Sequence, residues 1–269
     1  MIGVIGCGNM GGALLRGMLR AERFSPRQLI AWDSDPAKLA ALVRTLGIRR
    51  ARTNKEVAFA HAILLAVKPQ QMEEVLREIR PSLEHKPILI SIAAGIPIRW
   101  IEKRVGNKIP VIRVMPNTPA LVGAGISALA KGRAATQKDL RFAQKVFGCV
   151  GETVRVSESL MDAITAVSGS GPAYFFYLME QMILAGIQMG LSSETAQHLV
   201  VQTAVGAAQL ALKTKEGPAI LRARVTSKGG TTEAAFRQWK KQHLGDILQT
   251  GIRAAAKRAK ELSRNPCLF

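Results

Sequence analysis

The sequence predicts an α/β fold class, in which an N-terminal doubly wound parallel sheet is followed by an all-α second half. Short apolar runs alternate with helical patterns through the first half of the 269 residues, and this alternation is typical of parallel sheets with crossover helices. Strand signals almost vanish from Glu158 onward. Apolar residues make up 48% of the chain, which excludes intrinsic disorder. We therefore expect one domain over residues 1–155 and a second over residues 156–269.

The first half contains the expected sheet elements in order. Apolar runs of strand length predict the strands, and the nearly continuous run around Ile63 is typical of a strand covered on both faces. Apolar side chains at helical spacing predict the helices, and Pro36 stands at a first-turn position that helices accept. The predicted strands are 2–5, 29–32, 61–67, 87–92 and 111–114, and the predicted helices are 9–21, 36–46 and 69–79.

The second half contains only helical patterns. The predicted helices cover residues 171–189, 192–212, 218–224, 231–240 and 244–263. Phe175, Met179 and Met182 belong to an apolar stripe at helical spacing, which predicts a core or subunit-interface face rather than a cofactor site. No charge-free apolar run reaches the roughly 18 residues that a membrane helix needs.

A glycine-rich turn follows the first predicted strand and opens the first predicted helix. Its residues Gly6, Cys7, Gly8, Asn9, Met10 and Gly11 fit the pattern G-x-G-x-x-G. In this context the glycines permit a tight turn, close approach of a pyrophosphate and close packing of helix on strand. The helix N-terminus offers unpaired N–H groups and a positive dipole end to phosphates. The pattern predicts a dinucleotide site rather than a glycine turn without a ligand.

The end of the second predicted strand bears on which dinucleotide is used. Asp33 stands about 20 residues after the glycine turn, where an acid typically holds the ribose hydroxyls of NAD and repels the extra phosphate of NADP. Ser34 could hydrogen-bond that phosphate, and Arg49, Arg50 and Arg52 could pair with it if they lie nearby. The residues therefore favour NADH only slightly over NADPH.

The net charge of +19, from 38 Lys and Arg against 19 Asp and Glu, is the unusual feature of the composition. Such a surplus is also typical of nucleic-acid-binding proteins. The sequence has no recognised DNA-binding motif and no aromatic stacking platform, so specific nucleic-acid binding is the less favoured hypothesis. Part of the surplus could line a positive cleft for phosphates and an anionic substrate. Most of it is expected on solvated faces, such as that of Arg253, Lys257, Lys260 and Arg264.

Neither the cysteines nor the histidines form a pattern typical of a metal site. Cys7, Cys149 and Cys267 are widely spaced and include no CxxC pair, so no disulfide framework or zinc site is predicted. The 4 histidines are scattered without ligand spacing. We expect a cytoplasmic protein without a bound metal.

An ordered series of motifs runs through both halves of the chain. It comprises IGCGNMGG (5–12), AVKP (66–69), SIAAG (91–95), MPNTPA (115–120), VSGSGPAY (167–174) and SKGGTT (227–232). Through this series the chain resembles pyrroline-5-carboxylate reductase, a family of proline biosynthesis. The resemblance implies an N-terminal Rossmann-type doubly wound sheet followed by an all-α dimerisation domain. It also implies an active site shared between two subunits of a homodimer, which can assemble into a larger ring of dimers.

The resemblance implies reduction of the cyclic imine of 1-pyrroline-5-carboxylate to L-proline by hydride transfer from NADPH or NADH. Loops at the carboxyl ends of strands carry the ligands in an open parallel sheet, so we expect two such loops to line the cofactor site. Asn54 matches a family position that contacts the adenosine side. The predicted loop residues are Ala66, Val67, Lys68, Pro69, Ile92, Ala93, Ala94 and Gly95.

A second glycine-containing loop precedes the predicted helix that begins near Thr232. Two glycines allow close approach of the chain and their N–H groups can face an anion, so we expect the substrate carboxylate to bind at Ser227, Gly229, Gly230 and Thr231. Thr232 matches the family threonine whose hydroxyl bonds the imine nitrogen, and it is the expected catalytic residue. The competing interpretation is a helix N-cap at Thr231 or Thr232.

Two positions depart from the family pattern. Lys228 stands where the family usually has proline, and Ala223 where it commonly has an acid. The lysine adds positive charge beside the predicted carboxylate pocket, and the fixed φ of proline is lost. The alternative enzyme activity is reduction of a related cyclic imine, or of a 2-oxo acid, as in a neighbouring Rossmann family.

Overall fold

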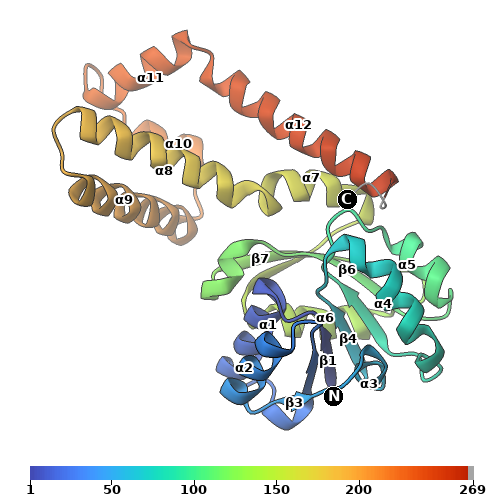
Figure 1. The fold of residues 1–269 in the computed structure, drawn as a ribbon. Helices are drawn as coiled ribbons and strands as arrows, with labels where there is room; N and C mark the ends of the chain where they lie inside the picture. The colour runs from blue at the N-terminus through green and yellow to red at the C-terminus, as the bar shows by residue number, and fades with distance from the viewer. Residues whose placement is uncertain (266–269) are drawn as a thin grey trace. The chain divides into compact units, whose positions relative to one another are not determined.

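The computed structural model describes residues 1–265, so Cys267 lies outside the described residues. The chain divides into two compact units (Figure 1). Among the described residues, the first unit contains 1–170 and 254–265, and the second is Gly171–Arg253. The predicted domain boundary falls where the last strand ends, and as a functional boundary it stays a prediction.

An eight-stranded sheet forms the first unit, with the strand order β3-β2-β1-β4-β5-β6-β7-β8. Neighbouring strands are parallel except β6 and β7, which run antiparallel. The strands are β1 (Ile2–Ile5), β2 (Leu29–Trp32), β3 (Arg49–Arg50), β4 (Ala62–Leu65), β5 (Ile88–Ser91), β6 (Val111–Met115), β7 (Gly125–Lys131) and β8 (Gly151–Arg155). The strand order reverses at β1, between β2 and β4, and open α/β sheets bind ligands at such a point.

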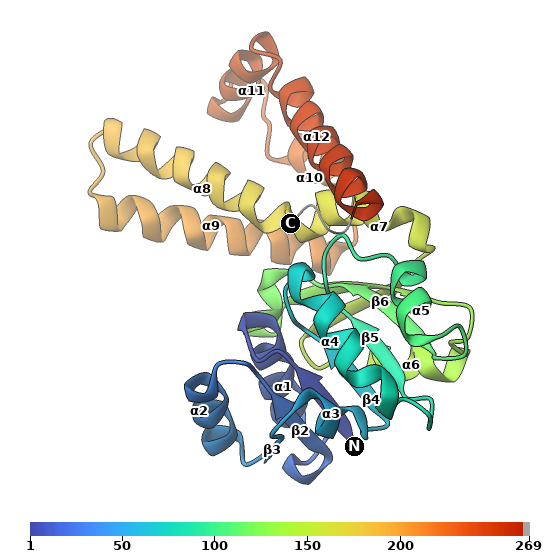
Figure 2. The same ribbon diagram turned by 45° about the vertical axis from the view of Figure 1, so that its right-hand side comes forward.

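Helices cover both faces of this sheet, which confirms the doubly wound fold class (Figures 1 and 2). Side chains alternate between the faces along each strand, so Val4 and Leu64 pack in one apolar cluster and Ile5 and Leu65 in the other. The first cluster contains residues of α1 (Asn9–Arg20), α2 (Pro36–Leu46) and α6 (Gln137–Phe147). The second contains residues of α3 (Asn54–Ala58), α4 (Met72–Ile79) and α5 (Ile98–Val105).

The turn from β2 into α2 is fixed by its own side chains. Asp35 is the N-cap of α2, and its Oδ1 accepts hydrogen bonds of 3.0 Å from the backbone N–H groups of Ala37 and Lys38. Pro36 follows at the first helical position, which suits its fixed φ, and Gly47 ends the helix with a φ of 64°. This turn places Asp33 and Ser34 at the carboxyl end of β2.

The remaining helices follow the sheet, and the first of them was not predicted from the sequence. They are α7 (Met161–Ile164), α8 (Gly171–Gln188), α9 (Ser193–Thr214), α10 (Pro218–Arg224), α11 (Thr231–Lys241) and α12 (Leu244–Arg264), and a π-helical turn, Thr165–Gly169, joins α7 to α8. All five helices predicted after residue 170 are confirmed to within two residues at each end. Within residues 1–265, no helix combines the length and the apolar character needed to span a membrane.

The predicted apolar stripe of α8 is not part of a core within the chain. Of the stripe, Phe175 and Met182 are exposed and Met179 is half-buried, and the neighbouring Phe176 and Tyr177 are exposed as well. Helix α9 packs against α8 and also carries exposed apolar side chains, among them Leu199, Val201 and Val205. Because these side chains are exposed in the single chain, the stripe is better explained as a subunit-interface face than as a core face.

Candidate active site

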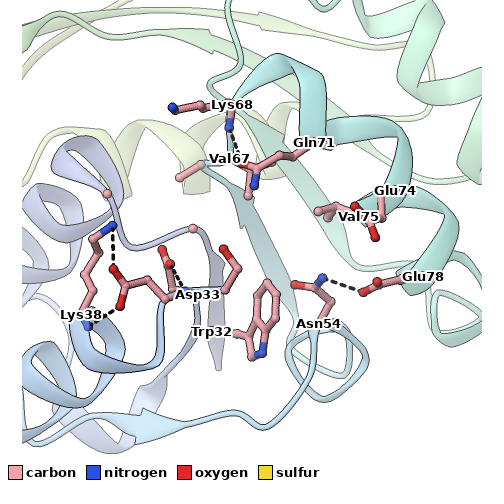
Figure 3. A pocket seen from close by; sticks show the side chains of 15 residues that line it. Trp32, Asp33, Lys38, Asn54, Val67, Lys68, Gln71, Glu74, Val75 and Glu78 are labelled. Carbon is pink, nitrogen blue, oxygen red and sulfur yellow. Dashed lines mark hydrogen bonds and ion pairs between the residues drawn. The ribbon is translucent and has the colours of Figure 1, made fainter.

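A cavity of about 410 Å³ lies at the carboxyl ends of β1 and β4, where the cofactor was expected (Figure 3). The glycine turn, the end of β2, the start of α3 and the segment from β4 into α4 supply its lining. The lining residues are Gly6, Gly8, Trp32, Asp33, Ser34, Asp35, Lys38, Asn54, Ala66, Val67, Lys68, Gln71, Glu74, Val75 and Glu78.

In the glycine turn, the fold itself requires glycine at two positions, and at a third position there is room for a side chain. Gly6 has a φ of +94°, and a Cβ placed there would lie 2.6 Å from the carbonyl oxygen of Ala66. A Cβ on Gly11 would lie 2.0 Å from the carbonyl oxygen of Gly6. By contrast, apart from Gly8 and its two chain neighbours, no residue of the described chain has an atom within 4 Å of a Cβ placed on Gly8. The open space at Gly8 fits a pyrophosphate that approaches the backbone closely.

The N-terminus of α1 faces this open space. Gly8 is the N-cap and offers no side-chain acceptor, and residues 9–12 of the first turn include no acid. The amides of Asn9 and Met10 lack intrahelical partners by position. These amides and the positive end of the helix dipole are suited to an anionic phosphate.

The Cys7 side chain belongs to the structure of the turn and not to the cavity lining. Its sulfur lies 3.6 Å from the carbonyl oxygen of Trp32. Burial, with a smaller contribution from the Asp33 carboxylate, raises the pKa of the Cys7 thiol to about 12. Only the thiolate is a strong nucleophile, so the buried Cys7 thiol offers no reactive sulfur to the predicted site.

Asp33 ties the glycine turn to the turn that follows β2. Its Oδ2 accepts the backbone N–H of Cys7 at 2.5 Å, and its Oδ1 accepts the backbone N–H of Asp35 at 2.8 Å. Each carboxylate oxygen can accept a further hydrogen bond, so the carboxylate can still meet a ribose hydroxyl. Asp33 therefore holds the glycine turn in place and also forms part of the cavity wall.

The basic residue beside Asp33 is not one that the sequence indicated. Arg49 and Arg50 lie exposed on β3, and neither they nor Arg52 are among the residues from 1 to 265 that line the cavity. Lys38 does line it, with its Nζ 3.7 Å from Oδ2 of Asp35. Hydrogen bonding from the backbone N–H of Lys38 lowers the pKa of Asp35. The first turn of α2 follows Asp33 directly, and this proximity was the available signal for Lys38.

Asn54 lies at the other end of the cavity, as the first residue of α3. It is only 2% exposed, and its Nδ2 donates a hydrogen bond of 2.7 Å to Oε2 of Glu78. Its Oδ1 is the one buried side-chain polar atom in residues 1–265 that has no hydrogen-bond partner. A buried acceptor without a partner in the wall of a cavity fits a ligand that donates a hydrogen bond there.

One face of α4 and of the turn before it also lines the cavity, and the sequence reasoning missed it. Gln71, Glu74, Val75 and Glu78 recur at the spacing of one helical face. The side chain of Gln71 accepts the backbone N–H of Lys68 at 3.3 Å and so holds the loop after β4. Helical spacing directly after a predicted ligand loop was the signal that could have identified this face.

The expectation of a positive cleft is wrong for this cavity. The acidic side chains in its lining are Asp33, Asp35, Glu74 and Glu78, against the basic Lys38 and Lys68. The group at this cavity that is suited to a phosphate is instead the backbone at the start of α1, with its positive dipole end. The basic surplus lies elsewhere, and the predicted solvated face of Arg253, Lys257, Lys260 and Arg264 is exposed.

The loop after β5 lies next to the loop after β4. The backbone N–H of Ile92 donates to the carbonyl of Leu65 at 3.1 Å, and Gly95 turns the chain with a φ of +70°. Residues Ile92, Ala93, Ala94 and Gly95 are not in the cavity lining described for residues 1–265. Pro69 begins a 3-10 turn, Pro69–Gln71, that leads into α4.

The second glycine loop lies in the second unit, before α11. The backbone N–H of Gly229 donates to Oε2 of Glu233 at 2.7 Å, and that of Gly230 donates to the carbonyl of Ser227 at 3.0 Å. The expectation that these two glycine N–H groups are free for an anion is therefore wrong in this structure. Both glycine amides are used to close the turn.

The threonines begin α11 and do not cap it. Gly230 is the N-cap, so the interpretation of Thr231 or Thr232 as the cap is wrong. No side chain in the described chain caps this helix end, and the first-turn amides of Thr231 and Thr232 lack intrahelical partners by position. These two amides and the Thr232 hydroxyl are the groups that this loop offers to a substrate.

Comparison with known proteins finds relatives that cover nearly the whole chain. Residues 158–262 match the family model for pyrroline-5-carboxylate reductase dimerisation, and residues 1–95 match a model described as NADP oxidoreductase, coenzyme F420-dependent. The pyrroline-5-carboxylate reductase of Pseudomonas aeruginosa is 42% identical over 97% of this chain and 96% of that protein.

Two solved structures are similar over nearly their full length. A pyrroline-5-carboxylate reductase from Coxiella burnetii is 37% identical, covers 97% of this chain and 98% of its own, and has a TM-score of 0.92. The Plasmodium falciparum pyrroline carboxylate reductase with NADP bound is 30% identical, covers 97% of both chains and has a TM-score of 0.88. With this identity over nearly its full length, the chain belongs to the pyrroline-5-carboxylate reductase family.

Proposed function

We propose that this protein reduces 1-pyrroline-5-carboxylate to L-proline with NAD(P)H. The observation that carries the proposal is the uncapped N-terminus of α1 beside the open space at Gly8, in a chain similar to these reductases from end to end. When bound, NAD(P)H supplies a hydride to the imine carbon, and the imine nitrogen holds the proton that completes the amine. The protein must bring the two partners together and exclude water.

The first unit holds the cofactor in this proposal. The amides at the start of α1 bind the pyrophosphate, with Gly8 allowing close approach. Asn54 binds the adenosine half at one end of the cavity. The loops after β4 and β5 face the nicotinamide half, where Lys68 and Gly95 belong to the turns that shape the site.

The choice between NADH and NADPH is set at the end of β2. Asp33 and Asp35 place two carboxylates beside the ribose position, and a 2′-phosphate there meets repulsion from both. Lys38 and Ser34 are the residues of the cavity that can offset this by contacting a 2′-phosphate. We expect both cofactors to bind, with NADH favoured.

The second unit supplies the substrate groups in this proposal. The amides of Thr231 and Thr232 hold the carboxylate, and Ser227, Gly229 and Gly230 shape the turn around it. The Thr232 hydroxyl orients the imine nitrogen. A threonine hydroxyl is a poor acid by itself, so it acts on an imine that binds already protonated, or relays a proton from water.

A homodimer follows from the exposed apolar face of α8 and α9. A contiguous apolar surface of this kind is typical of a subunit interface, and this part of the chain matches the dimerisation model. A ring of dimers is the larger assembly that we propose. Sedimentation velocity of the full chain distinguishes a monomer, a dimer and a ring.

The decisive experiment for the reaction pairs both cofactors with both candidate substrates. Purified protein is given NADH or NADPH with 1-pyrroline-5-carboxylate or with the six-membered 1-piperideine-6-carboxylate, and cofactor oxidation and proline are measured. We expect turnover with the five-membered imine and a higher kcat/KM with NADH. A preference for the six-membered ring supports the related imine reduction instead, and no turnover with either cofactor overturns the proposal.

Thr232 is tested by a pair of variants. Thr232→Ala removes the hydroxyl, and we expect kcat to fall by about 10²-fold while the melting temperature is unchanged. Thr232→Ser keeps a hydroxyl at the same position and should retain most of the rate. Equal rates for the wild type and Thr232→Ala would show that the hydroxyl has no part in the reaction.

A further inference from the structure

We propose that Glu78 is a positioning residue that fixes the orientation of the Asn54 amide, so that the cavity presents only a hydrogen-bond acceptor to the adenosine half of the cofactor. The inference rests on the proposed dinucleotide function of the cavity. It specifies the direction of one hydrogen bond in the site: the ligand group that contacts Asn54 has to be a hydrogen-bond donor. The group is the exocyclic amino group of adenine or a ribose hydroxyl.

The orientation of the amide follows from the chemistry of its neighbour. Nδ2 of Asn54 lies 2.7 Å from Oε2 of Glu78, and an ionised carboxylate can only accept a hydrogen bond. Placing Oδ1 there instead would set two acceptors against each other. The amide is therefore held with Nδ2 toward Glu78, although the two ends of an amide have nearly the same shape.

The other end of the amide is left without a protein partner. Oδ1 of Asn54 is buried and has no hydrogen bond within residues 1–265. Figure 3 shows it turned away from Glu78 and toward the side of Trp32, which also lines the cavity. The Trp32 ring is itself held, because its Nε1–H donates to the carbonyl of Arg52 at 3.2 Å. A buried unsatisfied acceptor is unfavourable, and a ligand donor removes that cost.

This requirement for a hydrogen-bond donor distinguishes nucleotides that have nearly the same size and shape. Adenine carries an amino group where hypoxanthine carries a carbonyl, so an inosine nucleotide would set a carbonyl oxygen against Oδ1 if the base is the contact. A nucleotide without ribose hydroxyls would leave Oδ1 unpaired if the sugar is the contact. Both sources share one chemistry, a neutral donor aimed at Oδ1.

Glu74 provides a matched control on the same helix. It lies one turn before Glu78 on α4 and lines the same cavity. Glu78→Gln and Glu74→Gln remove the same charge from the same face of α4. Only Glu78→Gln lets the Asn54 amide turn over, because a glutamine amide both donates and accepts. Glu78→Asp keeps an acceptor-only group at the position.

The experiment titrates the purified full chain with ADP, IDP and 2′,3′-dideoxy-ADP by calorimetry. In the wild type we expect one of the last two probes to bind about tenfold more weakly than ADP, since a donor is lost at a buried acceptor. Weaker IDP identifies the adenine amino group as the donor, and weaker dideoxy-ADP identifies the ribose. In Glu78→Gln the ratio of the affinity for ADP to the affinity for the weaker probe should fall several-fold. In Glu74→Gln and Glu78→Asp this ratio should stay at the wild-type value.

Two results would overturn the inference. If the wild type binds all three probes with the same affinity within experimental error, Oδ1 of Asn54 meets no donor. This part of the experiment needs no variant. A ratio that is the same in Glu78→Gln as in the wild type would mean that Glu78 has only a structural role, which weakens every probe equally. Loss of binding by all probes in the wild type contradicts the proposed cofactor site itself, so the two failures are distinguishable.

Discussion

Two glycines of the same turn should respond in opposite ways to the addition of a side chain. A Cβ at Gly11 would overlap the carbonyl oxygen of Gly6 at 2.0 Å, whereas a Cβ at Gly8 meets no atom of the described chain within 4 Å apart from its own residue and its two chain neighbours. Gly8 has φ −65° and ψ −166°, the extended conformation of an N-cap that any residue adopts. Gly11→Ala should therefore damage the fold, and Gly8→Ser should damage only phosphate binding.

The magnitudes follow from these contacts. The Cβ at Gly11 would overlap a backbone carbonyl that cannot move aside, so the cost is near the upper end of overpacking, about 3 kcal/mol. Alanine is about 1 kcal/mol better than glycine inside a helix, which leaves a net loss of about 2 kcal/mol and a melting temperature about 4–8 °C lower. Serine is a slightly better N-cap than glycine, so Gly8→Ser should melt within about 1 °C of the wild type or above it.

Cofactor affinity should separate the two positions further. A side chain at Gly8 displaces the pyrophosphate from the amides of α1, and a lost hydrogen bond to a charged group costs about 1.5–3 kcal/mol. We expect NADH to bind about 10- to 100-fold more weakly to Gly8→Ser. Melting is followed by circular dichroism without cofactor, and binding by NADH fluorescence. Wild-type affinity in Gly8→Ser, or a drop in its melting temperature equal to that of Gly11→Ala, would refute the assignment of this turn.

Three further predictions concern the first unit. Folding raises the pKa of the Cys7 thiol from 9.0 to about 12, so the folded chain holds this proton more tightly than the unfolded chain does. The free energy of unfolding should therefore decrease as the pH rises from 9 toward 12. Urea unfolding of Cys7→Ala should show a smaller decrease over the same pH range. In a Cys267→Ser background, neither Cys7 nor Cys149 should react with a thiol reagent at pH 8 before unfolding, because burial raises both thiol pKa values, and rapid labelling of the native protein would contradict this. Glu158 pairs with buried Arg113 at 3.3 Å and accepts the backbone N–H that begins α5 at 2.7 Å. Glu158→Ala should therefore cost about 3 kcal/mol in urea unfolding, and a loss below about 1 kcal/mol, typical of surface pairs, would count against it.

The sequence predicted the strands that are buried on both faces, because only those have long apolar runs. β3 contains just Arg49 and Arg50, both exposed, and has no apolar signal at all. β7 buries small side chains such as Ala128 and Ala130, which are weak indicators of a strand. The start of α6 has a sequence signal, because Thr136 and Asp139 form a capping box. The sequence prediction nevertheless did not include this helix.

The candidate site was predictable where a single segment forms it. The glycine turn and the loop after β4 are local sequence features, and the structure brings them to one cavity. Lys38 and Glu78 could not be assigned so directly, because their roles depend on which faces of α2 and α4 are turned toward the cavity. The use of the Gly229 amide by Glu233 was also not visible in a pattern that emphasised the glycines.

The exposed aromatic residues of α8 make the stability of this chain depend on its own abundance. When burial of an apolar face is supplied by a second copy, the free energy of unfolding includes a mass-action contribution that vanishes on dilution. The melting temperature should rise with each tenfold increase in protein concentration, and a newly made chain is exposed to aggregation until it meets another. A low level of expression would therefore lower the fraction of folded reductase as well as its amount.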